Sequence, residues 1–178
     1  GDDQKQANER FMFALALCHT VMTEENESDS TLRDFKAESP DEAALVSVAR
    51  DMGIVFKKRL RSSLLLEIYG EEQEFHLLDI IPFTSARKRM SCVIKTPDNK
   101  IILYTKGADS VIFQRLNPRE NPNELVSKTA LYLEDYANEG LRTLCIASKV
   151  LDPQVYDNWN KRYRRVLFRS NGSTRRGD

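Results

Sequence analysis

The chain has 178 residues, which suits one domain with a substantial core or at most two small ones. Hydrophobic residues make up 40% and charged residues 30% of it, as is typical of a soluble globular protein. The 27 basic and 27 acidic residues give a formal net charge of zero, which argues against nucleic-acid binding because such proteins usually carry a basic surplus.

The cysteine and histidine pattern gives no sign of a metal site. Cys18, Cys92 and Cys145 lie far apart in apolar segments and are predicted to be buried free thiols. The chain has only two histidines, and no CxxC or HxxxH spacing suggests a zinc site. The apolar run 11–21 is too short to cross a bilayer, and it lacks the cationic start of a signal peptide.

Two helices separated by an acidic loop are predicted at the start of the chain. The first covers residues 10–22, and the loop covers 24–36. Ser39 is a favourable N-cap for the second helix, since a proline follows it and Glu42 stands three residues after the cap. We expect this helix to end at Gly53.

The middle of the chain is rich in strand-forming residues. Pro-Asp-Asn at 97–99 is a strong turn signal between two of the runs. The predicted strands are 54–58, 64–69, 74–81 (which alternates only roughly), 90–96, 100–105 and 143–150. Because strands and helices do not alternate one by one, the fold class is predicted to be α+β, with an antiparallel β-sheet flanked by helices.

Helices are predicted between and after the last strands. A short one covers 110–116, and a final one begins at Pro153 and runs to about Tyr163. The tail 164–178 holds five arginines and little periodicity, so it is predicted to be disordered or foreign to the domain. The run 124–138 predicts an amphipathic helix with a buried side of Leu125, Ala130, Leu131, Leu133 and Ala137.

The stretch FTSARKRMS, residues 83–91, places an aromatic ring next to three cations. A nucleotide needs this combination, because Phe83 could stack on a base while Arg87, Lys88 and Arg89 meet the phosphates. If the strand begins early, Lys88 points away from Arg87 and Arg89. The alternative is a core phenylalanine followed by a solvated turn.

KGAD, residues 106–109, joins a predicted strand to a short helix. Gly107 would let the backbone approach a ligand closely, and Lys106 could meet a phosphate or the edge of a base. The alternative is an ordinary strand-to-helix turn capped by Asp109. No Walker A or GxGxxG pattern is present in the sequence.

SPDE (39–42) and GLRTL (140–144) are two further candidates. Glu42 could accept a hydrogen bond from a ligand amino group, although the same carboxylate could simply complete a capping box. Arg142 could bind a phosphate or only compensate a helix C-terminus. No carboxylate pair, Ser/His/Asp order or metal cluster stands out, so no catalytic residue is expected in this chain alone.

Together, SPDEAALV, FTSARKRMSCVI, KGADSVIF and EGLRTLC, in this order, resemble the nucleotide-binding domain of P-type ATPases. RKRMS and the aspartate of KGAD are similar to the phospholipid flippases (type IV) rather than to cation pumps. Further stretches, such as KTALYLEDYANEGLRTLCIA, are similar to fungal flippases of the plasma-membrane type. The resemblance covers roughly Gln4 to Tyr163, nearly the whole chain, and the sequence departs from the family after about Tyr163.

The resemblance implies an ATP pocket. Phe83 would stack on adenine, Glu42 would lie by its amino group, Lys106 near the base, and Lys88 and Arg142 at the phosphates. Residues of secondary importance in the pocket would be Asp41, Ser85, Arg87, Met90, Gly107, Ala108 and Leu144.

The resemblance also implies cofactors and partners. ATP would enter with Mg²⁺, mainly in the full-length protein. The phosphorylation and actuator domains of the same parent chain and an accessory glycoprotein subunit would be the partners, with no nucleic acid. The domain would face the cytosol from a plasma, Golgi or endosomal membrane. The sequence contains no DKTGT motif, so the phosphorylated aspartate is not in this chain.

A nucleotide-free regulatory or interaction domain of the same fold is the main alternative. Its partner surfaces would be the acidic loop 24–34 and the basic tail. A nucleic-acid site at residues 87–89 is disfavoured by the neutral overall charge.

Overall fold

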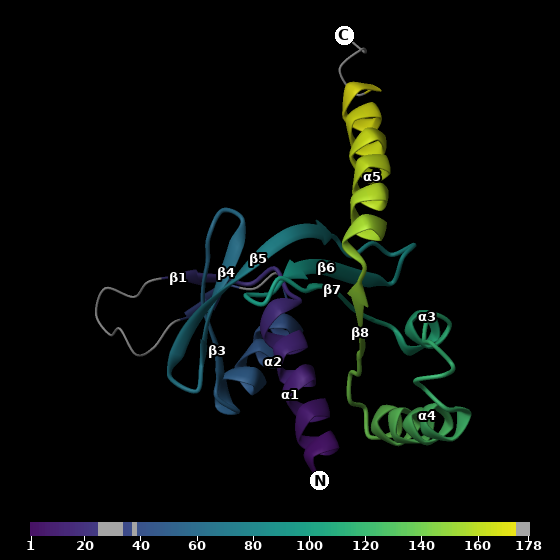
Figure 1. Ribbon diagram of the computed structural model, residues 1–178. Coiled ribbons are helices and arrows are strands. Elements are labelled where there is room, and N and C mark those ends of the chain that lie inside the picture. Colours follow the sequence, from purple (N-terminus) through teal and green to yellow (C-terminus); the bar gives the residue numbers. More distant parts are fainter. Residues whose placement is uncertain (25–33, 37–38, 174–178) are drawn as a thin grey trace.

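The computed structural model describes residues 1–24, 34–36 and 39–173. The helices are α1 (Asp2–Leu17), α2 (Pro40–Asp51), α3 (Asp109–Phe113), α4 (Asn123–Asn138) and α5 (Pro153–Ser173). The strands are β1 (Met22–Glu24), β2 (Asp34–Lys36), β3 (Ile54–Arg59), β4 (Ser63–Ile68), β5 (Glu71–Ile81), β6 (Arg89–Lys95), β7 (Ile101–Gly107) and β8 (Cys145–Leu151) (Figure 1).

Strands β3 to β8 form one sheet in which the spatial order equals the chain order. Every neighbouring pair is antiparallel. The turn 97–99 joins β6 to β7 as predicted, with Asn99 in the left-handed region at φ 64°. The predicted fold class, an antiparallel sheet flanked by helices, is confirmed.

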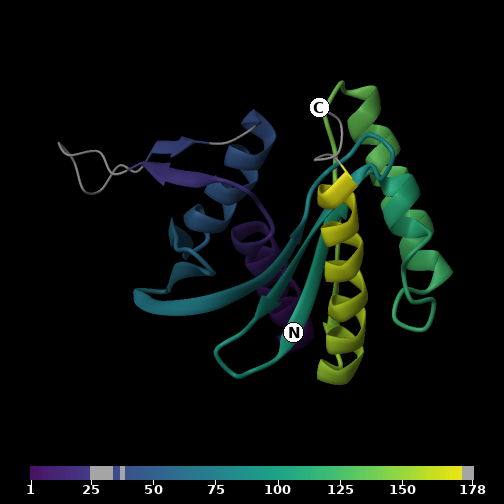
Figure 2. The same ribbon diagram turned by 90° about the horizontal axis from the view of Figure 1, so that it is seen from above.

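Helices cover the two faces of the sheet separately. Figure 2 shows α1 and α2 on one side of the sheet and α4 and α5 on the other. The larger core lies under α1 and α2 and includes Leu17, Val46, Leu66 and Cys92. A smaller core, centred on Val93, lies under α5. Because side chains alternate along a strand, β6 contributes to both cores.

A buried polar contact fixes α5 to the sheet. The hydroxyl of Tyr156 donates to Asp79 Oδ2 at 2.6 Å, and Arg164 Nη2 lies 3.0 Å from Asp79 Oδ1. Burial, and then the bond to Asp79, raises the pKa of Tyr156, so the phenol stays a donor. This contact fixes α5 against the face of the sheet that carries Val93.

Several predicted boundaries near the N-terminus are wrong. The first helix covers Asp2–Leu17 rather than 10–22, because its apolar residues cluster at its C-terminal end and the polar first half forms exposed turns. Two short paired strands, β1 and β2, occupy both ends of the segment predicted as the loop 24–36. Residues 25–33 lie outside the described part of the chain.

The predicted burial of α4 is also wrong. No α4 residue is buried, and Leu125 and Leu131 are 53% and 62% exposed. No other described element lies close enough to the apolar side of α4 to bury it. Of the predicted buried set, Leu133 is half-buried, while Ala130 and Ala137 are exposed.

The final helix is longer than predicted. It continues to Ser173 instead of ending near Tyr163, so most of the segment predicted to be a disordered tail is helical. Arginine is a good helix former, and Arg164 at the start of this segment contacts Asp79 of the sheet, whereas Val166 and Phe168 beyond it are exposed. Residues 174–178 are outside the described residues. Among the described helices, none has both the length and the apolar character needed to cross a bilayer.

Candidate functional site

The four stretches singled out in the sequence meet at one end of the sheet. FTSARKRMS leads into β6, KGAD ends β7, and GLRTL leads into β8. In the sheet Met90 pairs with Lys106, and Gly107 pairs with both Arg89 and Cys145. SPDE, at the start of α2, joins them through side chains. Stretches separated by up to a hundred residues therefore form one surface.

Glu42 connects α2 to the sheet. Ser39 Oγ caps the helix by accepting from the Glu42 amide at 3.3 Å, which confirms the predicted N-cap. The Glu42 carboxylate points elsewhere: Oε1 accepts from Lys106 Nζ at 3.2 Å and from the Thr20 amide at 3.2 Å, and Oε2 accepts from the Thr20 hydroxyl at 2.9 Å. Only half of the capping box forms, because the carboxylate has better partners.

The Lys106–Glu42 ion pair is almost completely enclosed. The Lys106 side chain is 8% exposed and that of Glu42 is 12% exposed. The charge of Lys106 is therefore largely balanced, and only a small part of its side chain is open to a ligand. Three contacts occupy Glu42, and a carboxylate offers about four acceptor positions, so one remains for a ligand donor.

A second ion pair lies at the surface of the same end. Arg142 Nη2 and Nε lie 2.7 and 3.1 Å from Asp41 Oδ1. Both side chains are open to solvent, so the pair contributes little stability and can reorganise. Arg142 lies in the loop before β8, which begins at Cys145 rather than at residue 143 as predicted, and this leaves its guanidinium able to turn toward a ligand.

The loop before β6 is held in an unusual conformation. Lys88 has φ 53°, a left-handed conformation that costs a non-glycine residue about 1 kcal/mol. Its amide donates to the carbonyl of Thr84 at 2.8 Å, and its own carbonyl accepts from the Ala108 amide at 3.1 Å. These bonds hold the exposed Lys88 side chain above KGAD.

Gly107 is required sterically at this contact. A Cβ added there would lie 2.3 Å from the carbonyl oxygen of Lys88 and 2.7 Å from Cβ of Arg89. Both obstacles belong to the paired strand or its loop, so they cannot move aside independently. Position 107 therefore needs glycine so that the backbone at Lys88 and Arg89 can lie directly against the end of β7.

Gly107→Ala should lower the free energy of unfolding by about 1–3 kcal/mol, the usual cost of overpacking. Urea unfolding of the purified chain measures it. Ser85→Ala, an exposed change in the same loop, is the control and should stay within about 0.5 kcal/mol of the wild type. A Gly107→Ala protein as stable as the control would show that the loop can move away without cost.

The other predicted pocket residues are spread over this end of the sheet. Phe83 is 61% exposed on the loop, and Leu144 is 46% exposed before β8. Ser85 is exposed and Ala108 half-buried, whereas Met90 is buried in the core under α1 and α2.

Arg87 is the member of the set that turns away. Its Nη1 donates to the carbonyls of Pro82 at 2.6 Å and Arg89 at 3.2 Å, and the side chain lines a cavity on the α5 face. Arg89 lines the same cavity and Lys88 does not. Strand alternation is not the cause, because β6 begins only at Arg89 and Lys88 has a left-handed backbone conformation. The structure thus joins Lys106 to Glu42 and Arg142 to Asp41 in two separate ion pairs. The backbone of Lys88 lies against the end of β7 at Gly107 and Ala108.

Sequence reasoning missed Thr20. It gives Glu42 two of its three hydrogen bonds, although it belongs to the segment that joins α1 to β1. Nothing in the local sequence around Thr20 indicates this role, which depends on the packing of α1 against α2.

Comparison with known proteins identifies the chain. The model of the family described as "P-type ATPase, cytoplasmic domain N" matches residues 7–170. Phospholipid-transporting ATPase DNF2 of Saccharomyces cerevisiae is 49% identical over 169 residues, and DNF1 of Chaetomium thermophilum is 47% identical over 163. Both alignments cover 92% of this chain. The probable phospholipid-transporting ATPase IM of Homo sapiens is 40% identical over 168 residues, or 94% of the chain.

The chain spans only a small part of these relatives, 10% of each of the two fungal proteins and 13% of the human one. The similarity to phospholipid-transporting ATPases, fungal ones included, confirms the resemblance seen in the sequence motifs. The chain belongs to the family of P-type ATPase cytoplasmic N domains.

Proposed function

We propose that the chain binds ATP at the end of the sheet where the four stretches meet. The observation that carries the proposal is this convergence: the Lys106–Glu42 and Arg142–Asp41 pairs adjoin a loop that holds an exposed ring and an exposed cation. Adenine stacks on Phe83 and its amino group donates to Glu42. Lys88 and Arg142 meet the phosphates, and Lys106 lies toward the base.

The charges present fit a nucleotide. Three cations converge on the site, and two of them, Lys88 and Arg142, keep exposed side chains that can bend over a polyphosphate. Mg²⁺ enters with the nucleotide, since this ion commonly binds through substrate phosphates and water. Ser85, Gly107, Ala108 and Leu144 form the walls.

In a full-length parent, this domain presents the γ-phosphate to an aspartate on a separate phosphorylation domain. Turnover of that aspartyl phosphate powers translocation of a phospholipid to the cytosolic leaflet. The phosphorylation and actuator domains of the same chain and an accessory glycoprotein subunit are the partners. The names of the relatives support only the phospholipid-transporting ATPase activity of such a parent. The aspartate, the neighbouring domains and the accessory subunit are what the resemblance to P-type flippases implies.

An amide NMR titration with ATP, with and without Mg²⁺ and with GTP as the comparison, tests the proposal. Shifts should cluster at Glu42, Phe83, Lys88, Lys106 and Arg142 and be stronger for ATP than for GTP. Equal shifts for both nucleotides, or shifts elsewhere, would contradict an adenine pocket at this end of the sheet.

Phe83→Ala should weaken ATP binding by about 1–3 kcal/mol, or roughly 5- to 150-fold, because stacking on the ring would be lost. Phe83 is 61% exposed, so the fold should tolerate the change. Calorimetric titration measures the affinity. Phe168→Ala removes a phenylalanine from the exposed part of α5, where it is 78% exposed, and should bind ATP like the wild type. Equal affinity for the Phe83 variant would refute stacking on this ring.

A second candidate function is a nucleotide-free interaction domain. The observation that favours it is the uncovered apolar side of α4, with Leu125, Leu131 and Tyr132 more than half exposed. If this function is correct, ATP causes no specific change in the amide chemical shifts around Phe83. The NMR titration therefore distinguishes the two functions.

A further inference from the structure

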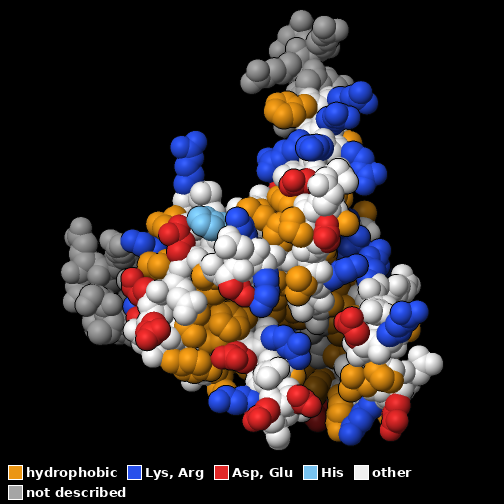
Figure 3. All heavy atoms as spheres, in the orientation of Figure 1, with side chains coloured by type: hydrophobic (Ala, Val, Ile, Leu, Met, Phe, Trp, Pro, Cys, Tyr) orange, Lys and Arg blue, Asp and Glu red, His pale blue; other side chains and the backbone are white. Residues whose placement is uncertain are grey.

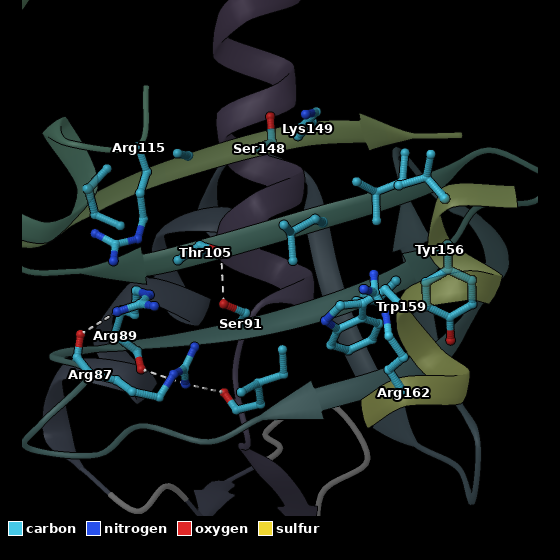
Figure 4. Close-up of a pocket in the computed structure, with 17 residues that line it drawn as sticks. Arg87, Arg89, Ser91, Thr105, Arg115, Ser148, Lys149, Tyr156, Trp159 and Arg162 are labelled. Atoms are coloured by element: carbon cyan, nitrogen blue, oxygen red, sulfur yellow. Dashed lines mark hydrogen bonds between the residues drawn. The ribbon is translucent and has the colours of Figure 1, made fainter. Parts of the chain in front are cut away.

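A second cavity lies on the face of the sheet opposite the Lys106–Glu42 pair. It has a volume of about 510 Å³, within the range of about 300–1,000 Å³ that is usual for small-molecule sites. Its floor is formed by β6, β7 and β8 on the face of the sheet that packs against α5, and α5 forms one wall (Figure 4). Strand alternation separates it from the candidate ATP site, since Lys106 and Met90 point to the other face.

The charged side chains that line this cavity are all cationic. Five cations line it and, among the described residues, no carboxylate does. In a chain whose acidic and basic residues balance, such a concentration is a local feature. The lining cations are Arg87, Arg89, Arg115, Lys149 and Arg162, and none of them forms an ion pair with a described carboxylate.

Three of the guanidinium groups gather at one end. Figure 4 shows Arg87, Arg89 and Arg115 together at the left. The first two hold each other in place: Arg89 Nη1 donates to the Arg87 carbonyl at 2.8 Å, and Arg87 Nη1 to the Arg89 carbonyl at 3.2 Å. Partial desolvation, and then repulsion from Arg115 and Arg87, lowers the pKa of Arg89. An anion bound among the three guanidinium groups would offset the repulsion between them.

Polar groups and rings complete the cavity. The hydroxyls of Ser91 and Thr105 lie 2.9 Å apart on its floor, and whichever of them accepts from the other can donate its own hydrogen to an anion. Tyr156 and Trp159 of α5 lie at the far end, opposite the three arginines. Lysine and arginine side chains also gather along α5, as Figure 3 shows, so the approach from this side is positive.

We propose that this cavity binds a small phosphate ester with an apolar body. The phosphate lies among Arg87, Arg89 and Arg115, which present forked donors suited to its oxygens. The apolar body lies along the sheet against Trp159. A nucleotide and a lipid headgroup with its first acyl carbons share this chemistry.

The chain supplies its own reporter for this site. Trp159 is the only tryptophan, and it is half-buried in the cavity wall, so its fluorescence responds to a ligand there. Phenyl phosphate and hexyl phosphate are the probes, one with an aromatic body and one with a lipid-like body. Phenol and hexanol lack the phosphate and serve as the ligand controls.

Both phosphate esters should produce a saturable change in Trp159 fluorescence, with dissociation constants no weaker than about 10 mM, and neither alcohol should. Stronger binding of phenyl phosphate points to a nucleotide-like source, and stronger binding of hexyl phosphate to a lipid-like one. Arg115→Ala should weaken both at least about tenfold, the effect of one charge-assisted bond.

Arg119→Ala is the matched control variant, because Arg119 is exposed in the segment after Arg115 but does not line the cavity. It should bind within about twofold of the wild type. Phe83→Ala should also bind the probes normally, which separates this cavity from the candidate ATP site. Absence of a saturable change, or equal weakening by Arg115→Ala and Arg119→Ala, would overturn the proposal.

Discussion

Replacing Glu42 with alanine should lower the free energy of unfolding by about 3–5 kcal/mol, the cost of leaving one partner of a buried ion pair alone. The Lys106 ammonium, 8% exposed, would lose its only ion-pair partner among the described residues. The amide and hydroxyl of Thr20 would also lose their acceptor. Urea unfolding of the wild type and the variant measures the difference.

The chain offers a matched control at the adjacent position. Asp41→Ala removes a carboxylate from the same helix turn, but its pair with Arg142 is solvent-exposed, and its loss should cost less than about 1 kcal/mol. The double variant Glu42→Ala, Lys106→Met should recover part of the lost stability, since it removes the unpaired charge. Similar losses for Glu42→Ala and Asp41→Ala would mean that burial of the pair is unimportant.

The stability of the chain should fall as the pH drops below about 6.5, with His19 contributing up to about 1.4 kcal/mol per pH unit. Burial, reinforced by Arg59, lowers the pKa of His19 from 6.5 to about 3. Between these values the unfolded chain binds a proton that the folded chain does not, so acid favours unfolding. Above about pH 6.5 His19 is neutral in both the folded and the unfolded state, so it adds nothing there to the pH dependence of the free energy of unfolding.

The geometry around His19 explains why the folded state holds it neutral. The amide of Val21 donates to Nδ1 at 3.1 Å, and Nε2 donates to the carbonyl of Ala16 at 2.8 Å. A proton on Nδ1 would face the Val21 amide and the Arg59 guanidinium, whose Nη2 is 3.4 Å away. The protonated ring has no acceptor on that side among the described residues.

Urea unfolding at about pH 7 and pH 5 checks this, with an expected difference of about 2 kcal/mol from His19. His19→Gln should reduce the pH dependence by that amount, whatever its effect at neutral pH. His76→Gln, which changes the other histidine of the chain at an exposed position, should keep the wild-type dependence. The idea fails if the His19 variant keeps the full dependence.

Local sequence signals predicted the fold well wherever structure depends on neighbouring residues. The Ser39 cap, the hairpin turn at 97–99 and all six main strands follow from such signals. The rough alternation predicted for 74–81 has a physical cause, since the pairing of β5 with β6 shifts register between Leu77 and Asp79. The same propensity arguments could not show that α4 is uncovered, because burial depends on what lies opposite.

The candidate site was predictable only in its components. Phe83, Lys88, Lys106 and Arg142 stood out by residue type and position, but their convergence follows from the order of β6, β7 and β8 in the sheet. No feature of the sequence around Thr20 indicated that it would bind Glu42. Arg115 was not singled out either, because its importance comes from the two arginines that the sheet places beside it.

The alternation along β6 makes the length of the preceding loop as important as its composition. Met90, Cys92 and Ile94 pack under α1 and α2, whereas Arg89 and Val93 face α5. Deleting or inserting one residue between β5 and β6 without a compensating bulge would exchange the two sets, placing a guanidinium in the core and a methionine in the cationic cavity. Evolution can therefore vary the side chains of this loop far more easily than it can change the number of residues in it.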